Sequence, residues 1–426
     1  MIGKINNLII ILLLPLQVYA DEIFSIENIG ERVPITRPLA EFDPELDAYP
    51  DPFSSDQILL TINIDNYSRF KDSILTPGQI KMFETYPKTF KINVYPSRRS
   101  CAVPPEVNKL TVKNALLIDE GEGVDGVVGS IPFPNPSEAL HHVWNHILRY
   151  RGVEIYGASP FYIINSDGTR TYGAGEAIAK NFWNPFVRND EKGLQGMLMT
   201  KVTHPPRLAD ASTLVIESLN AFKTPRRAWV YNPGTRRVRR APDITYDYKP
   251  SASQGLTTVD QVDGFNGAKD RYYWSDLGTQ LRLMPYNAYK FHETPVEKTL
   301  TPNHVNQDYL RYELVQVNVV EAKLKEDKRH IIPNRIMYFD VDSHNMLAEE
   351  TYDDNTSLMS YREFPIINFY DQPMCLSIHS ATYDFATRRY QLQNVRSTDL
   401  PKVQWRLKEP HDENMFTPEG LKRFAR

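Results

Sequence analysis

From about residue 155 onward the sequence repeats one pattern, in which short runs rich in Tyr, Val, Ile and Met alternate with clusters of turn-forming residues. The stretches "SPFYII-NSDGT-RTY" and "RRAWVY-NPGT-RRVRR" (226–240) predict hairpins, and "RIMYFDV-DSHN-MLAEETY-DDNTS-LMSYREF" (335–364) predicts three consecutive strands. The stretch "SIHSATYDF-ATR-RYQLQNV" (377–395) ends the series. Because the spacing is regular and the connections are short, we expect a mainly β protein, an antiparallel meander curved or closed into a barrel-like sheet.

The strand predicted from Leu310 to Leu324 carries apolar residues on both of its faces. An antiparallel sheet with one solvated face would alternate cleanly between apolar and polar residues. The second face must therefore be covered by a helix, by the N-terminal region or by an apolar ligand. Helices on one face and a filled core on the other are the simplest of these arrangements.

The N-terminal stretch "MIGKINNLIIILLLPLQVYADE" has the pattern of a secretory signal peptide. Lys4 supplies the positive start, the apolar run after it is too short to span a bilayer, and Val18-Tyr19-Ala20 fits a cleavage site. We expect residues 1–20 to be removed after Ala20 and the mature chain to be exported and soluble. Residues 21–50 are polar, have no period and predict an extended arm.

Charge and cysteine content narrow the possible functions. The formal net charge is −4, which does not favour a nucleic-acid partner. Cys101 and Cys375 are the two cysteines of the chain. An even number in an exported protein allows a disulfide, and two buried free thiols are the alternative.

Residues 51–154 predict helical and extended segments that pack on the sheet. Thr76 and Pro77 are typical of a helix start, with Thr76 as the N-cap. The stretch "GSIPFPNPSEALHHVWNHILRYRG" (129–152) predicts an extended lead-in followed by an amphipathic helix that Ser137 could cap. The apolar face of this helix provides three candidates for a lid over the sheet: Leu140, Trp144 and Ile147.

The histidines of the same helix raise the question of metal binding or catalysis. His142 and His146 are one turn apart on the side opposite the apolar face, but the residue after His142 is Val143, where the common helical zinc motif has glutamate. Solvated or hydrogen-bonded histidines are the simpler interpretation. The stretch "VGSIP" lacks the flanking glycines of a nucleophile elbow, and no glycine loop for phosphate is present. We expect no metal, no cofactor and no catalytic site.

Several stretches in order resemble one bacterial family: "VDGVVGSIPFPNP", "HHVWNHILRYRG", "RAWVYNPGTRRVRRAP", "DGFNGAKDRYYW", "MPYNAYKFH" and "LTPNHVNQDYLRYELVQVNVVEAKLKEDKRHIIPNRIMYFDVDS". It is a family of unknown-function domains classed with outer-membrane lipoprotein-sorting proteins, in the LolA/LolB-like superfamily. The resemblance runs from about residue 50 to about residue 395. Residues 397–426 are expected to be a C-terminal tail.

The resemblance implies a periplasmic protein whose β domain, residues 155–396, is a curved and unclosed antiparallel barrel of LolA/LolB type. Its concave face would be apolar and partly covered by helices. Proteins of this superfamily hold acyl chains in that concavity and carry lipid or lipoprotein across the periplasm. The family also implies two partners, an inner-membrane exporter of the resistance-nodulation-division type and an outer-membrane protein.

Strand position and side-chain character provide candidates for the residues that line the concavity, although each could equally be ordinary core: Trp229, Tyr231, Leu283, Tyr312, Leu314, Met337 and Phe339. Six arginines surround one predicted turn, among them Arg236, Arg237, Arg239 and Arg240. These four are candidates for contact with anionic headgroups or with an acidic partner. Pairing with carboxylates of neighbouring strands is the alternative.

Three functions are compatible with the sequence. The leading hypothesis is a periplasmic carrier or chaperone that binds an apolar, lipid-like cargo, touches membranes transiently and passes the cargo between an inner-membrane exporter and the outer membrane. The second is a structural adaptor of an envelope transport complex that carries nothing. The third is an envelope lipid hydrolase, which the missing nucleophile motif disfavours.

Overall fold

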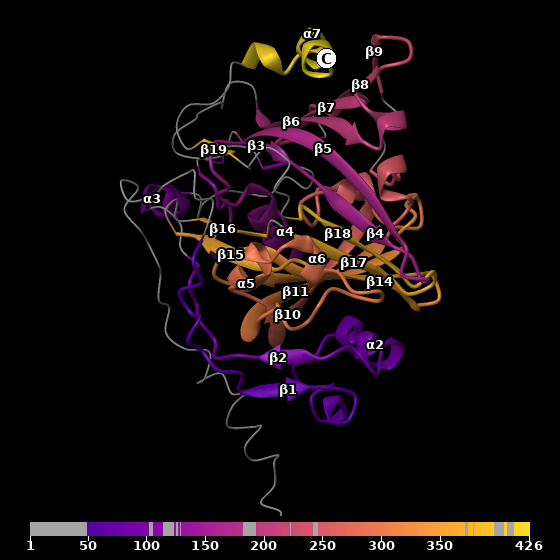
Figure 1. Cartoon of the computed structure of the whole chain (residues 1–426). Coiled ribbons are helices and arrows are strands. Elements are labelled where there is room, and N and C mark those ends of the chain that lie inside the picture. Colours follow the sequence, from indigo (N-terminus) through magenta and orange to yellow (C-terminus); the bar gives the residue numbers. More distant parts are fainter. Residues whose placement is uncertain are drawn as a thin grey trace, which may run out of the picture.

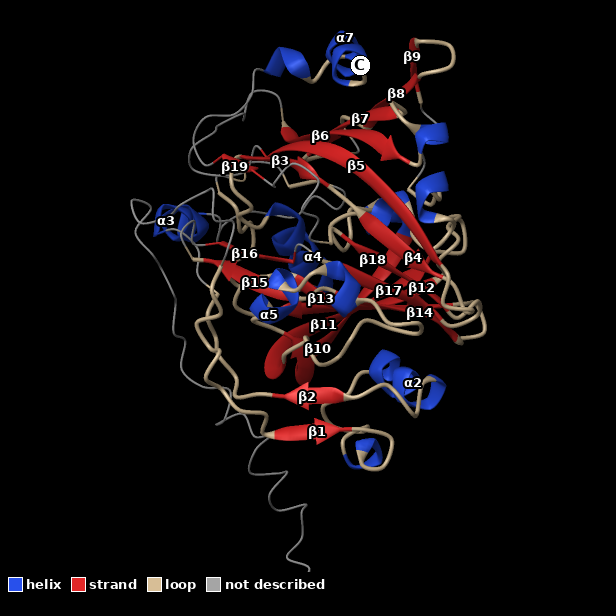
Figure 2. Cartoon of the chain, in the orientation of Figure 1, coloured by secondary structure: helices blue, strands red, loops and turns tan. Residues whose placement is uncertain are grey.

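The computed structural model describes residues 49–426 except 102–104, 114–122, 125–126, 128, 182–192, 222, 242–245, 371–373, 378, 396–403 and 407–412. The predicted signal peptide and nearly all of the predicted arm lie outside the described residues. The described chain is mainly β with a few helices (Figures 1 and 2).

The first strands are β1 (Leu60–Ile62), β2 (Ile92–Val94), β3 (Glu154–Ala158), β4 (Phe161–Ile164), β5 (Arg170–Asn181), β6 (Leu194–His204), β7 (Ser212–Ser218), β8 (Arg227–Asn232) and β9 (Arg237–Arg240). The later strands are β10 (Tyr272–Pro285), β11 (Tyr312–Leu324), β12 (Asn334–Asp340), β13 (Met346–Tyr352), β14 (Leu358–Glu363), β15 (Ile366–Phe369), β16 (Met374–Ser377), β17 (Ser380–Asp384), β18 (Arg389–Gln393) and β19 (Gln404–Arg406). The helices are α2 (Pro77–Thr85), α3 (Pro105–Lys113), α4 (Ala139–Leu148), α5 (Tyr289–Glu293), α6 (Val296–Thr299) and α7 (Pro418–Phe424).

Strand pairing follows the predicted meander. The antiparallel neighbours run in the order β10, β11, β12, β13, β14, β17, β18, β4, β5, β6, β7, β8 and β9. The second half of β5 also pairs with β3, which in turn pairs with β19. The short strands β1 and β2 pair with each other, and β2 meets β11 in the parallel sense. Among the described strands no pairing joins β9 to β10, so the sheet stays open.

The longest pair of neighbouring strands, β10 and β11, contains a local irregularity. The register shifts between Asp276 and Thr279, and Gly278 lies there with φ +80°. Glycine adopts this left-handed backbone without a steric penalty, and an extra residue in one strand increases the local twist.

The two apolar faces of β11 contribute to two different cores, as the mixed pattern of its sequence requires. Val317 and Val319 belong to a core that also contains side chains of α2, β1 and β2. Val320 and Ala322 belong to a second core that contains α4. The predicted start of α2 is confirmed, since the Thr76 side chain accepts from Gln79 in a capping box that precedes Pro77. Helices and the N-terminal region therefore cover the sheet on both faces.

The segment expected to be a C-terminal tail adds structure of its own. Its residues 404–406 form β19, and α7 packs against β7, β8 and β9 with Phe416, Leu421 and Ala425 buried in the second core. Thr417 caps α7 by accepting from the Gly420 N–H. These contacts connect the C-terminal residues to the far end of the sheet.

Candidate functional site

Helix α4 lies against β10 and β11 and is buried along almost its whole length. The lid candidates Trp144 and Ile147 are core residues, and Leu140 packs against the same core while half-buried. The face of the sheet that α4 covers is apolar and includes Val320, Ala322, Met337, Phe339 and Met346.

The histidines of α4 are not solvated: His141, His142 and His146 are all buried, and the hydrogen-bonded interpretation holds for His141 and His146. Other segments cover their side of the helix. The ring of His141 stacks on Phe133 with centroids 3.9 Å apart. Ser137 does not cap the helix either: Glu138 is the N-cap residue, and the Ser137 N–H instead donates to His141 Nδ1.

His146 connects α4 to two other segments. Its Nε2 donates to the Asp263 carbonyl over 2.7 Å, while its Nδ1 accepts from the Met346 N–H over 3.1 Å. Burial, together with the nearby Arg149 charge, lowers the pKa of His146 to about 3. His146 is therefore a neutral hydrogen-bonding bridge at physiological pH, which excludes it as a proton-switched group.

The C-terminal end of α4 is held by an ionic cluster centred on Asp263. Arg149 donates to both carboxylate oxygens of Asp263, over 2.6 and 3.0 Å, and Arg151 pairs with the same carboxylate. Although burial opposes it, the charges of Arg149 and Arg151 hold the pKa of Asp263 well below its usual value. Both arginines also donate to the last helical carbonyls, those of His146 and Ile147. They thereby satisfy acceptors that a helix end leaves open.

Asp263 was not among the site residues expected from the sequence. Its neighbour Gly264 has φ +86°, and a Cβ atom there would lie 3.0 Å from His146 Nε2. Only glycine allows the loop to approach α4 this closely. The signal available in the sequence was the "VDGFNG" turn, which marks a loop with special backbone requirements.

A second, fully buried ionic network holds the loop that carries Asp263 against the sheet. Asp260 pairs with Arg335 of β12, and Glu349 of β13 pairs with both Arg335 and Arg362. Arg362 also donates to the carbonyls of Gln261 and Gly264. The charge of Arg335 overcomes the effect of burial and lowers the pKa of Asp260. The sheet therefore fixes the loop, and the loop fixes the end of α4.

Two polar atoms of α4 are buried without a hydrogen-bond partner among the described residues: Trp144 Nε1 and His142 Nδ1. The other His142 nitrogen lies 3.6 Å from an Asp276 carboxylate oxygen, and Lys269 Nζ lies 4.0 Å from the centre of the Trp144 ring. Leaving a buried donor unpaired costs about 1–3 kcal/mol. Burial of the apolar side chains of α4 thus stabilises the position of the helix, whereas the two unpaired polar atoms destabilise it.

The structure divides the seven cavity candidates between the two cores. Tyr231, Met337 and Phe339 belong to the core that contains α4, with Trp229 packed against it. Leu283, Tyr312 and Leu314 belong to the other core, with α2 and the N-terminal strands. The seven therefore do not line one common surface.

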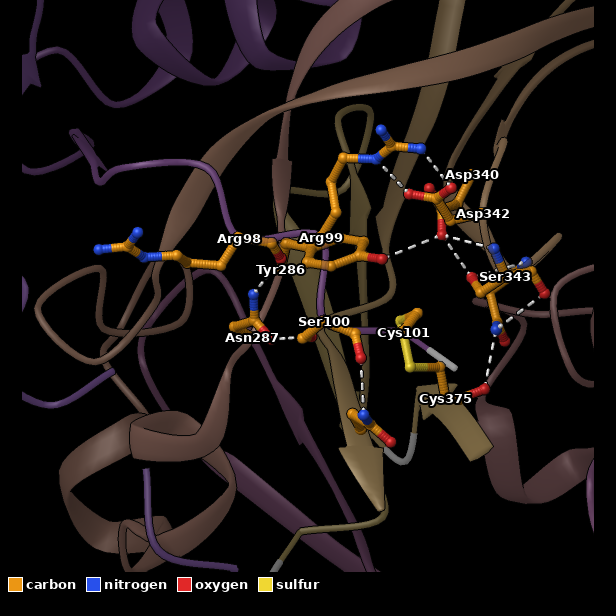
Figure 3. Close-up of a disulfide and its surroundings, with 12 residues drawn as sticks. Arg98, Arg99, Ser100, Cys101, Tyr286, Asn287, Asp340, Asp342, Ser343 and Cys375 are labelled. Carbon is orange, nitrogen blue, oxygen red and sulfur yellow. Dashed lines mark hydrogen bonds and ion pairs between the residues drawn. A yellow bond between two sulfur atoms is a disulfide. The ribbon is translucent and has the colours of Figure 1, made fainter. Parts of the chain in front are cut away.

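The disulfide region (Figure 3) is connected to the α4 site by hydrogen bonds. Cys101 and Cys375 are bonded, with Cα atoms 5.5 Å apart. The Cys375 carbonyl accepts from Asn345, whose Oδ1 accepts from Arg149 over 2.7 Å. The disulfide is therefore two hydrogen bonds away from the ionic cluster at the end of α4.

Beside the disulfide, a recess of about 10 Å³ is lined by residues that include Arg99, Tyr286 and Asp340. It has room for roughly one water molecule. Burial and the neighbouring Asp342 charge raise the pKa of Asp340 to about 6. A recess of this size does not accommodate a lipid.

The described ranges contain neither a candidate metal site nor a helix that could cross a membrane. These ranges contain no group of three or more His, Cys, Asp or Glu side chains arranged to hold a metal ion. Their helices are also too short or too polar to cross a membrane.

Comparison with known proteins places these features in a family. The chain is 35% identical over 381 residues to the uncharacterized protein PA3922 of Pseudomonas aeruginosa, a match that covers 87% of this chain and 83% of that protein. A crystal structure of a Vibrio parahaemolyticus domain named for outer membrane lipoprotein sorting aligns with a TM-score of 0.45 at 15% identity, covering 67% of this chain and 98% of that one.

Two further crystal structures show weak similarity of the same kind. A DUF1329 family protein from Desulfovibrio piger aligns with a TM-score of 0.44 at 12% identity, over 63% of this chain and 92% of that one. A LolA superfamily protein from Nitrosomonas europaea aligns with a TM-score of 0.40 at 9% identity, over 66% of this chain and 98% of that one. The family model described as "Protein of unknown function (DUF1329)" matches residues 61–422, and the chain belongs to this family.

Proposed function

We propose that the protein is a periplasmic carrier of an apolar, lipid-like molecule, with an open barrel of LolA/LolB type, and that α4 covers the surface where the cargo binds. The observation that carries the proposal is the apolar core that the ten-residue helix α4 shares with the face of β10–β13 and with strands β5–β8. An acyl chain could occupy that surface in place of α4 and would preserve most of its burial, worth about 25 cal/mol per Å².

The way α4 is attached supports a helix that can move. Its C-terminal end is held by hydrogen bonds and ion pairs from Arg149 to Asp263 and Asn345, in which water can replace the protein partners at a net cost of about 1.5–3 kcal/mol for each charged bond. The unpaired Trp144 and His142 atoms would regain partners in water. Both effects reduce the free-energy difference between the covered and the uncovered state.

The disulfide and the N-terminal sequence support an oxidising compartment, which for this chain would be the periplasm. In this proposal the carrier receives its cargo from an inner-membrane exporter of the resistance-nodulation-division type and delivers it toward an outer-membrane protein. It acts without a catalytic step.

Two measurements test the proposal. Native mass spectrometry of protein purified from the periplasm without detergent, followed by solvent extraction, would detect and identify a bound apolar species. Titration with a dibrominated fatty acid would then quench Trp144, because bromine quenches only nearby indoles. The difference between the wild type and Trp144→Phe isolates the contribution of Trp144 from those of the other tryptophans.

We expect a stoichiometric apolar species and a quenching component that disappears in Trp144→Phe. A clean protein mass, with quenching unchanged by Trp144→Phe, would refute the carrier proposal. The non-carrying adaptor would then be the better hypothesis.

A further inference from the structure

The hairpin formed by β8 and β9 lies at one end of the molecule (Figure 1). Arg236, Arg237, Arg239 and Arg240 are all exposed. Along β9, the side chains of Arg237 and Arg239 project from one face of the strand, and those of Val238 and Arg240 project from the other face. The hairpin is therefore positively charged on both sides.

These four arginines differ from Arg226 of the same sequence run. Arg226 is largely buried, pairs with Glu217 and lies 4.1 Å from the centre of the Tyr246 ring. No carboxylate within the described part of the chain lies within 4.0 Å of Arg236, Arg237, Arg239 or Arg240. The alternative of pairing with neighbouring strands therefore does not hold for these four among the described residues.

Helix α7 extends the positive surface. It packs against β9, and its apolar side faces the core, so Lys422 and Arg423 are exposed, as is Arg426 directly after it. These residues come from the segment that the sequence suggested to be a tail. Folding brings two basic stretches together that are separated by more than a hundred residues of sequence.

Charged side chains on an edge strand also protect against edge-to-edge aggregation. That role would require charges on β9 alone, and it does not explain why the basic residues of α7 gather beside them. The formal net charge of the protein is −4, so a concentrated positive region gives the molecule an electric dipole, which orients it in an electric field.

We propose that the β8–β9 hairpin and α7 form a docking surface for an anionic membrane, at which the arginines contact phosphate groups of the headgroup layer. A projecting strand with guanidinium groups on both faces fits a deformable layer of phosphates better than the rigid surface of an acidic protein. The turn Asn232-Pro233-Gly234-Thr235 carries no large apolar side chain, so the contact would be electrostatic and sensitive to salt. The proposal holds independently of whether the protein carries a cargo.

Vesicle co-sedimentation of the mature full-length chain tests the docking surface. Vesicles of phosphatidylcholine alone are compared with vesicles that contain about one-third phosphatidylglycerol, at about 0.05 M and about 0.5 M salt. The test variant is Arg237→Glu/Arg239→Glu. The control variant is Lys71→Glu/Lys88→Glu, which changes the net charge equally at exposed positions around α2, at the other end of the molecule (Figure 1).

We expect the wild type to bind the anionic vesicles at low salt, with loss of binding at high salt and on neutral vesicles. The Arg237→Glu/Arg239→Glu variant should bind at least about tenfold more weakly, while the lysine control stays within about twofold. Circular dichroism spectra and unfolding midpoints that match the wild type establish that both variants are folded. An equal loss in both variants, or no binding by the wild type, would overturn the proposal.

Discussion

Replacing Asp263 by asparagine should destabilise the protein by removing the charge that holds α4. The Arg149 side chain is only 3% exposed and donates to both oxygens of the carboxylate. Removing one partner of a buried ion pair costs about 3–5 kcal/mol, because the remaining charge stays buried. The Asp263 side chain is 32% exposed, so water can partly solvate the cluster. We therefore expect a loss of about 2–3 kcal/mol in the free energy of unfolding.

Urea unfolding followed by tryptophan fluorescence measures this loss, with Asp270→Asn as the matched control. Asp270 pairs with Lys328 at 3.1 Å, but both side chains are about one-third exposed, so its loss should cost at most about 1 kcal/mol. The pKa of Asp263 is lowered, so its contribution exists above the usual carboxylate pKa and disappears only in strong acid. The deficit of Asp263→Asn should therefore be constant between about pH 5 and 8. A deficit no larger than that of the control would refute the role of Asp263.

Three further predictions follow from buried groups. Cys101→Ser/Cys375→Ser should lose about 2–5 kcal/mol in urea unfolding under non-reducing conditions, because the bond closes a separation of 274 residues; an unchanged midpoint would contradict this. Burial raises the pKa of Glu363 from 4.5 to about 7, so the wild type loses stability as the pH rises from 4.5 to 7. The stability of Glu363→Gln should not fall in this range, so the variant should gain roughly 3 kcal/mol relative to the wild type by about pH 7; a pH-independent difference would disprove the raised pKa. Trp144→Phe should lose about 1–3 kcal/mol in the same assay, because the smaller ring leaves a cavity at a fully buried position; an unchanged midpoint would contradict the tight packing of α4.

Local patterns in the sequence were sufficient to predict much of the architecture. The alternation of apolar runs and turn residues predicted the antiparallel meander, and the start of α2 followed from Thr76 and Pro77. The two-faced apolar pattern of β11 correctly required cover on both sides of the sheet. These features depend on neighbours in sequence, through strand periodicity and capping, and are therefore readable from short stretches.

The sequence left open, for a physical reason, whether the histidines of α4 are solvated or hydrogen-bonded. The helix has an apolar face and a polar face, and the polar face of an amphipathic helix usually lies toward solvent. A loop more than a hundred residues away covers that face and supplies the Asp263 carbonyl and carboxylate as partners. No local pattern states which distant segment will satisfy a polar side chain.

The sequence by itself determined the strand class, the succession of hairpins, the two-sided burial of β11 and membership in a family whose function is unknown. Tertiary structure alone decided that the cavity candidates divide between two cores, that Cys101 meets Cys375, and that α7 lies beside the arginines of β9. The reason is that periodicity sets which face of an element is apolar, whereas the partner of that face depends on how strands and loops far apart in the chain come together in space.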